Sequence, residues 1–305
     1  MVTQRLQRLR KGVPGVPRPR VGSLLAATVM ILGAREAHQG FPTAFTAQEK
    51  VCSWLGWAPV PGTPLFRSVQ GAFPGALPGI ALASRITQAI DPYGLRKNNT
   101  IYGESLCSDE INNRIGHLPD ILQHHFGTVF PLSGIGGAPF VGKTGFAAFS
   151  SHVPENGHVF ILFGPHVGFS PDGDIGKYLR KGHSGLSSAC GAVVAAYNQV
   201  VHDMAAGMST EHDMEEAWLR AKLAPHCLQI EKSAAPMVEL TKKAYSIVQD
   251  EMLTIVNTNF GSGYLVLMGG IQINMPEPYQ DHFLPLHFTI RSASEEPVDL
   301  MPLLK

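Results

Sequence analysis

The sequence predicts an α/β fold with a mostly parallel central sheet flanked by helices. Residues 159–163 form an uninterrupted apolar run, which is typical of a strand buried on both faces. Strand-like segments also mix with amphipathic helix-like segments along the chain, and this mixture is typical of an α/β domain. The 305 residues suffice for one sizeable core.

The individual elements follow from local patterns. Residues 60–80 are rich in Pro and Gly and are expected to wrap the surface. Residues 100–112 predict a strand, a turn around Cys107 and the start of a helix. A buried helix is expected over 187–204, with Ser187 or Ser188 as its cap. The remaining elements are the buried strand within 157–169, amphipathic helices over 209–223 and 235–253, and strands over 263–275 and 283–291.

The composition narrows the classes of function. Acidic and basic residues balance at 24 each, so no polyanion is implied as a partner and we expect no nucleic-acid binding. Only 16% of the residues are charged and 44% are hydrophobic, as in a globular enzyme. Four scattered cysteines are too few for a disulfide framework. Reduced thiols or metal ligands are the better interpretation.

The N-terminal segment differs from the rest of the chain. Residues 1–20 hold six basic side chains, and an apolar run of about 14 residues follows over 21–34, shorter than the roughly 20 residues that cross a membrane. This order is typical of a targeting peptide, although an uncleaved anchor or a frayed tail would fit too. We expect residues 1–45 to be a presequence, cleaved or disordered, that directs the protein to a plastid. Residues 46–305 then form a single domain with no integral membrane span.

Three side chains are candidate metal ligands. Cys107 and His166 each follow a predicted strand, where α/β proteins build their sites. Cys190 falls in the first turn of a predicted helix, whose free amide groups favour a thiolate. Two thiolates and one imidazole suit Zn²⁺ and leave a fourth position for water, whose pKa zinc lowers to about 7. The alternative is that these cysteines are small buried hydrophobic residues.

Asp109 follows Cys107 in a Cys-x-Asp pattern. Its carboxylate could accept a hydrogen bond from the water at the fourth position, or could ligate zinc itself when that water is absent. Arg114 could hold the carboxylate charged. Alternatively, Asp109 is a helix N-cap and Arg114 is a solvated surface residue.

A rival motif occupies residues 137–144. The segment GAPFVGKT matches the phosphate-binding pattern G-x-x-x-x-G-K-[ST], with Lys143 on phosphate and Thr144 on magnesium. That motif needs a strand before it and a long helix after it. The preceding residues are too rich in Gly and Pro for a core strand, and Pro154 leaves room for about two helical turns. A glycine loop that passes close to the zinc pocket is the better interpretation.

Five segments, in this order, resemble the limiting-CO2-inducible protein B/C family of algae, which is related to theta-class carbonic anhydrases. They are LCSDEINNR (106–114), GIGGAPFVGKTGFAAFSSHVPENG (134–157), VFILFGPHVGFSPDG (159–173), SSACGAV (187–193) and GGIQINMPEPYQDHFLPLHFTIR (269–291). The resemblance implies a fold like that of the beta carbonic anhydrases and a homodimer or a hetero-oligomer with a related family member. It also implies zinc on Cys107, His166 and Cys190.

The resemblance further implies an activity. The expected function is zinc-dependent carbonic anhydrase activity, interconverting carbon dioxide and bicarbonate in an algal carbon-concentrating mechanism, with Asp109 and Arg114 as catalytic residues. The arginine of the beta-class Cys-x-Asp-x-Arg pattern is absent, because that position is Ile111. Arg114 is therefore one candidate partner of Asp109, and Arg180 is another. A catalytically silent zinc-binding protein that acts in a complex is the alternative function.

Overall fold

The computed structural model describes residues 63–202, 211–256 and 259–305. The expected presequence, residues 1–45, lies outside the described residues, so its interpretation stays a prediction. The strands are β1 (Leu77–Pro78), β2 (Thr100–Leu106), β3 (Val129–Pro131), β4 (His158–Gly164), β5 (His166–Gly168), β6 (Lys177–Tyr178), β7 (Ser187–Ser188), β8 (Leu265–Asn274), β9 (His282–Arg291) and β10 (Val298–Asp299). The α-helices are α4 (Pro64–Ala72), α5 (Gly79–Ile90), α6 (Leu118–Phe126), α7 (Gly142–Ser150), α8 (Gly191–Val201), α9 (Met214–Leu223), α10 (Cys227–Glu231) and α11 (Pro236–Ile255).

The central sheet confirms the predicted α/β fold. Its strand order is β1-β9-β8-β4-β2-β3, with β5 continuing beside β8 and β10 beside β9. The pairs among β3, β2, β4 and β8 are parallel, and so is the pair of β5 with β8. Only the edge formed by β9 and its neighbours β8, β1 and β10 is antiparallel.

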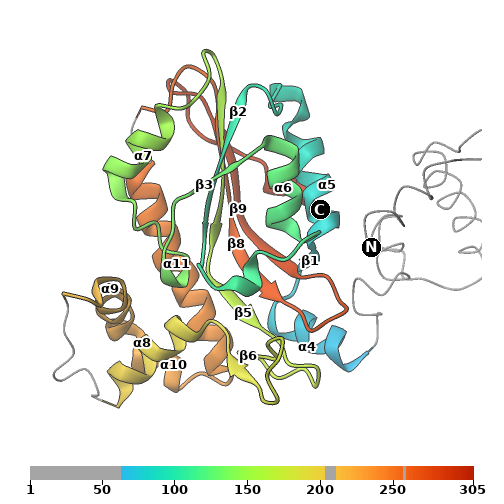
Figure 1. The fold of residues 1–305 in the computed structure, drawn as a ribbon, viewed down its shortest axis with the longest axis vertical. Helices are drawn as coiled ribbons and strands as arrows, with labels where there is room; N and C mark the ends of the chain where they lie inside the picture. Colours follow the sequence, from blue (N-terminus) through green and yellow to red (C-terminus); the bar gives the residue numbers. More distant parts are fainter. Residues whose placement is uncertain (1–62, 203–210, 257–258) are drawn as a thin grey trace, which may run out of the picture. The chain divides into compact units, whose positions relative to one another are not determined.

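Helices cover both faces of this sheet. Helices α5 and α6 lie on one side, α7 and α11 on the other, and α8, α9 and α10 gather near one end (Figure 1). Strand β4 shows why: Val159, Ile161 and Phe163 belong to the core that includes α7 and α11, whereas Phe160 and Leu162 belong to the core that includes α5 and α6. Alternate side chains of a strand face opposite sides, so an all-apolar strand needs a helical layer on each side.

Two local predictions are wrong. Residues 64–72 form helix α4, not a surface loop, and its Leu65 and Val69 are buried in the core. Ser187 and Ser188 form strand β7, and the N-cap of α8 is Cys190. The first error arose because Pro64, which is favoured in the first turn of a helix, was taken as a loop residue.

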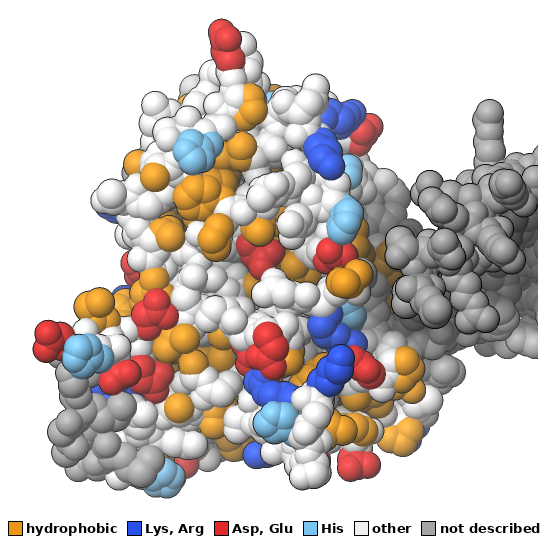
Figure 2. Space-filling view, in the orientation of Figure 1, with side chains coloured by type: hydrophobic (Ala, Val, Ile, Leu, Met, Phe, Trp, Pro, Cys, Tyr) orange, Lys and Arg blue, Asp and Glu red, His pale blue; other side chains and the backbone are white. Residues whose placement is uncertain are grey.

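Within the described part of the chain, no helix is both long enough and apolar enough to cross a membrane. Acidic and basic side chains are interspersed on the face drawn in Figure 2.

Candidate metal centre

Three separate elements bring the candidate ligands to one end of the sheet. Cys107 directly follows β2, His166 begins β5 after β4, and Cys190 caps α8. Strands β2 and β4 are parallel neighbours with Leu106 opposite Gly164, so their carboxyl ends meet at the same edge. A ligand set placed at this edge follows from the parallel topology.

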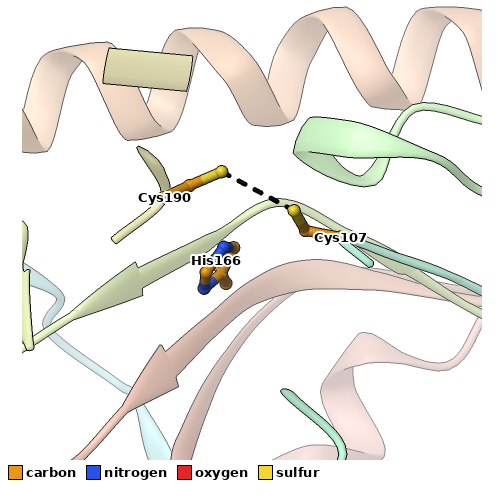
Figure 3. A group of neighbouring side chains, drawn as sticks. All are labelled: Cys107, His166 and Cys190. Atoms are coloured by element: carbon orange, nitrogen blue, oxygen red, sulfur yellow. Dashed lines mark hydrogen bonds between the residues drawn. The ribbon is translucent and has the colours of Figure 1, made fainter. Parts of the chain in front are cut away.

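The three side chains form one buried cluster. Sγ of Cys107, Sγ of Cys190 and a ring nitrogen of His166 all lie within 4.8 Å of one another. The two sulfur atoms are 3.7 Å apart and point toward each other beside the imidazole (Figure 3). All three residues are buried: the exposed fraction is 5% for Cys107, 4% for Cys190 and 2% for His166. The sequence-based prediction that these residues converge is confirmed.

The arrangement fits a zinc ion. Two sulfur ligands at about 2.3 Å from a tetrahedral zinc are about 3.8 Å apart, close to the observed separation. Nε2 of His166 is buried and has no hydrogen-bond partner. A buried polar atom without a partner is costly, and a metal bond would satisfy it. Both the donor set and the orphaned nitrogen therefore indicate a metal site.

The pKa values of the two thiols shift in opposite directions. The hydrogen bond with Cys107 lowers the pKa of Cys190 against the opposing effect of burial, and the backbone amides of Val193 and Ala192 contribute to the lowering. That same hydrogen bond, together with burial, raises the pKa of Cys107. Cys190 is therefore the more acidic of the two thiols, and binding a metal to both sulfurs would displace the thiol protons.

A glycine loop passes close to this cluster, as predicted. The backbone N–H of Gly136 donates to Sγ of Cys107 at 3.2 Å. Gly137 has φ +80°, and a Cβ atom there would overlap the carbonyl oxygen of Gly164. Only glycine allows both the backbone conformation and this close approach. The loop therefore supports the end of β2 and closes one side of the site.

The same loop does not have the surroundings of a nucleotide-binding motif. No strand of the described chain leads directly into residues 137–144, because β3 ends at Pro131 and a 3-10 helix, Ile135–Gly137, follows. Helix α7 ends after nine residues. Lys143 and Thr144 are exposed. The rival interpretation as a phosphate-binding loop lacks the strand–loop–helix unit that the motif requires.

Asp109 lies beside the cluster and is held by Arg180. The guanidinium donates from Nη1 and Nη2 to the two carboxylate oxygens, each at 2.8 Å. Oδ2 of Asp109 is 3.7 Å from Nε2 of His166. Burial opposes ionisation, yet the hydrogen bonds from Arg180 and the electrostatic effect of the nearby His166 lower the pKa of Asp109 to about 2. The carboxylate also accepts from the N–H of Ile111, so Asp109 is a helix cap as well.

Arg180 reaches the site from a two-stranded ribbon. Strands β6 and β7 pair antiparallel, and Arg180 follows β6. Its Nε donates to Oγ of Ser187 at 2.9 Å, and its Nη1 also contacts Glu110. The ribbon leads directly into Cys190, so the same short segment supplies a ligand and the partner of Asp109.

Arg114 does not pair with Asp109. Its Nη1 donates to Oδ1 of Asp281 at 3.1 Å and to the Met275 carbonyl at 2.9 Å. Of the two candidate partners of Asp109, the structure places Arg180 there and corrects the expectation for Arg114. The reason is the 3-10 helix Glu110–Asn112, which carries the chain away from Asp109 toward the end of β8.

Two polar residues that sequence reasoning missed complete the centre. Nδ1 of His166 lies 2.7 Å from Oδ1 of Asn274, and Nδ2 of Asn274 donates to Oδ2 of Asp281 at 3.2 Å. Asn274 ends β8, in which all ten residues are buried. Asn274 and Gln272 are polar residues in a buried strand, and such residues were the signal that could have found it, because they need specific partners.

The fold and the three clustered side chains define an α/β protein with a buried Cys-His-Cys centre. The family model for limiting CO2-inducible proteins B/C beta carbonic anhydrases matches residues 76–292. The chain belongs to this family. Among curated protein sequences, none matches this chain.

Solved structures agree with the family assignment. A mutant of PtLCIB4, described as a homolog of the limiting CO2-inducible protein LCIB, is 31% identical with a TM-score of 0.73, over 79% of this chain and 100% of that one. PtLCIB4 itself is 30% identical with a TM-score of 0.69, over 76% and 98%. LCIB is 23% identical with a TM-score of 0.59, over 75% and 96%, and this likeness concerns the fold alone.

Proposed function

We propose that this protein is a zinc-dependent carbonic anhydrase that interconverts carbon dioxide and bicarbonate. One observation carries the proposal: an ionised Asp109, whose two oxygens both accept from Arg180, lies beside the buried Cys-His-Cys cluster. In that cluster Nε2 of His166 has no hydrogen-bond partner. Cys107, His166 and Cys190 would hold the zinc ion. When bound, zinc supplies a water whose pKa is near 7, and hence a nucleophile at neutral pH.

Asp109 orients that nucleophile. Each carboxylate oxygen receives one hydrogen bond from Arg180, and Oδ1 also accepts from the N–H of Ile111, so Oδ2, on the side of His166, keeps a further lone pair. Asp109 accepts a hydrogen bond from the nucleophilic water and so determines which lone pair faces the carbon of the substrate. Because Arg180 holds both oxygens, the carboxylate stays ionised and is restrained from moving onto the metal. This restraint favours a working hydratase over the catalytically silent alternative.

Carbon dioxide needs an apolar place beside the nucleophile. Ile111, Tyr178 and Ala189 form a small buried cluster, and each is within two residues of Asp109, Arg180 or Cys190. A cavity of about 410 Å³ adjoins it, lined in part by Ile111, Tyr178, Arg180 and His183. Water adds to carbon dioxide at the apolar cluster to give bicarbonate and one proton, and both leave through this cavity to solvent.

The test combines metal analysis with a carbon dioxide hydration assay on the full chain loaded with zinc. We expect one zinc per chain and measurable turnover, with turnover greatly reduced in Asp109→Asn. One zinc per chain without turnover would contradict the hydratase and support the silent, zinc-binding role in a complex. Nucleotide protection without stoichiometric zinc would support the phosphate-binding alternative.

We further propose a plastid location, in a carbon-concentrating mechanism, as a homodimer or a hetero-oligomer with a related family member. The basic, apolar N-terminal segment and the family relationship support these proposals. A fluorescent fusion to residues 1–45 tests the location: uptake by algal plastids is expected, and a cytosolic signal contradicts it. Light scattering of the purified protein tests the oligomeric state.

A further inference from the structure

A chain of buried hydrogen bonds leads away from the metal centre on the side of His166 that faces the sheet. His166 in β5 pairs with the last residues of β8, and Gly168 lies opposite Asn274. Nδ1 of His166 is 2.7 Å from Oδ1 of Asn274. Behind Asn274 lies the fully buried Asp281. The chain therefore joins a proposed metal ligand to a buried carboxylate.

The surroundings of Asn274 fix which end of its amide faces His166. Three oxygen acceptors face the Nδ2 end: Oδ2 of Asp281 at 3.2 Å, Oδ1 of Asn112 at 3.1 Å and the carbonyl of Ile111 at 3.2 Å. If the amide were turned over, its oxygen would face three acceptors and no donor. The network thus requires the orientation in which Oδ1 faces His166.

This orientation also fixes the tautomer of His166. An amide oxygen only accepts, so Nδ1 of the imidazole must carry the proton. A neutral imidazole has one N–H group, and Nε2 is therefore left with a free lone pair. Nε2 is also the nitrogen that has no hydrogen-bond partner and lies toward Asp109. The tautomer required by Asn274 is the one that can bind a metal through Nε2.

Several donors hold the carboxylate of Asp281 in place. Its Oδ1 accepts from the backbone N–H of Met275 at 2.8 Å and from Nη1 of Arg114 at 3.1 Å. Its Oδ2 accepts from Nε2 of Gln272 at 3.2 Å in addition to Asn274. A buried carboxylate with several charge-assisted or amide donors is fixed in place, which makes it an anchor for the amide it contacts.

We infer that Asp281, acting through Asn274, is a positioning residue that sets the tautomer of His166 for metal binding. The inference deepens the proposed function, because it concerns the same metal centre. Arg114, which cannot reach Asp109, serves this second carboxylate. In Asp281→Asn the new side chain can turn an N–H₂ group toward Asn274, so only Asn112 and the Ile111 carbonyl still hold the amide and a fraction of the amides turns over. In that fraction the N–H₂ of Asn274 faces Nδ1, and the proton of His166 occupies the position of the metal on Nε2.

The direct test needs no variant. Nitrogen NMR of the metal-free protein with ¹⁵N-labelled histidine, recorded at increasing pH until the His166 signals no longer change, reports which ring nitrogen of His166 carries the proton. The resonance is assigned by its loss in His166→Gln. We expect the proton on Nδ1. A proton on Nε2 in the wild-type protein overturns the inference.

The variants measure the size of the effect. We expect Asp281→Asn to shift the tautomer toward Nε2–H and to weaken zinc binding about 10- to 100-fold in a chelator competition. Asp250→Asn is the matched control: it makes the same substitution at an exposed carboxylate on α11 and should leave both readouts unchanged. Should Asp281→Asn fail to fold, Asn274→Ala removes the acceptor of His166 and leaves Asp281 its other donors. It is expected to weaken zinc binding to a similar extent.

The outcomes separate this inference from the proposed function. Wild-type zinc affinity and an unchanged tautomer in a folded Asp281→Asn protein overturn the inference, whatever the hydratase assay gives. Conversely, the zinc-loaded protein can lack turnover while the tautomer of His166 and the zinc affinities of the variants are as expected. That result overturns the hydratase proposal alone.

Discussion

Two aspartate–arginine pairs flank His166, and they differ in what they can touch. Asp109 and Arg180 lie on the Nε2 side, and Arg180 lines the cavity that opens beside the site. Asp281 lies on the Nδ1 side behind Asn274. Its side chain is 0% exposed, compared with 12% for Asp109.

The comparison teaches that similar ion pairs can have separate roles around one ligand. The outer pair, Asp109 and Arg180, is near enough to meet a substrate at the open position. The inner pair differs in its carboxylate: Asp281 is fully buried behind Asn274, although Arg114 lines the same cavity as Arg180. Asp109 should therefore control turnover and Asp281 should control metal affinity.

The largest effect is expected from removing a ligand that lies between the two pairs. Cys107→Ala leaves one thiolate and one imidazole, too few to hold zinc tightly. We expect loss of both stoichiometric zinc and hydratase activity, measured by metal analysis and a hydration assay on the same preparation. Cys227→Ala is the matched control, since Cys227 is a buried cysteine outside the cluster. Retained zinc and activity in Cys107→Ala would exclude the proposed centre.

Asp109→Asn separates the outer pair from the inner pair. The amide keeps the size of the side chain but lacks the charge that accepts from the nucleophile. Turnover at saturating zinc should fall about 100-fold or more, with zinc affinity near that of the wild type. Asp281→Asn should show the reverse pattern. Equal losses of zinc affinity in the two variants would indicate that Asp109 is itself a ligand and would remove the distinction between the pairs.

The inner side of the site should be sensitive to acid. His282 follows Asp281 and is buried, and burial lowers its pKa to about 4 despite the Gln280 carbonyl and Asp281. Between about pH 6.5 and pH 4 the unfolded chain takes up a proton that the folded protein does not. The free energy of unfolding should therefore decrease as the pH is lowered through this window. The contribution of His282 to this decrease is ~3 kcal/mol.

The acid effect is measured by urea unfolding at several pH values. His282→Asn keeps a hydrogen-bond donor for the Gln280 carbonyl and should flatten the dependence. The control is His124→Asn, because the side chain of His124 is 77% exposed. An unchanged slope in His282→Asn would assign the acid sensitivity to other groups.

A smaller effect is expected from Arg180→Lys. Lysine is a point charge and cannot donate to both oxygens of Asp109 in the fixed geometry of a guanidinium. The pKa of Asp109 should rise from about 2, and kcat/KM should fall about 10-fold, most strongly at acidic pH. In Arg114→Lys, zinc affinity should change instead. If kcat/KM at saturating zinc falls equally in Arg180→Lys and Arg114→Lys, the two pairs do not have separate roles.

The smallest effect is expected in the glycine loop at residues 137–144, which contains no residue of either aspartate–arginine pair. Lys143 is exposed at the start of α7. Lys143→Ala should leave zinc content and turnover unchanged, and magnesium nucleotide should not raise the Tm of the wild-type protein. A nucleotide-dependent rise in Tm that Lys143→Ala abolishes would revive the phosphate-binding interpretation.

Much of the fold and the ligand set could be predicted because both depend on local patterns. The apolar run of β4 fixes a strand between two helical layers. Cys107 and His166 each follow a strand, and parallel pairing brings them to one edge. Helix α4 was missed because Pro and Gly were taken as loop residues without regard to Pro at the first helical position.

The partners of Asp109 and His166 could not be predicted from local patterns. Arg180 is 71 positions from Asp109 and depends on the path of the β6–β7 ribbon. Arg114, nearer in sequence, is carried away by a 3-10 helix. Asn274 and His166 are 108 positions apart and meet only because β5 pairs with the end of β8. Such contacts follow from tertiary topology rather than from spacing.

The ribbon that carries Arg180 has an evolutionary consequence. Arg180 contacts Asp109 but not Cys107, His166 or Cys190 in the described hydrogen bonds. If the proposed function holds, a lineage that replaces Arg180 would lose the hydratase activity while the metal site, the core and the fold persist. Descendants with an intact metal centre and no turnover are then an expected product of drift in such a protein, and the identity of residue 180 would distinguish them from active relatives.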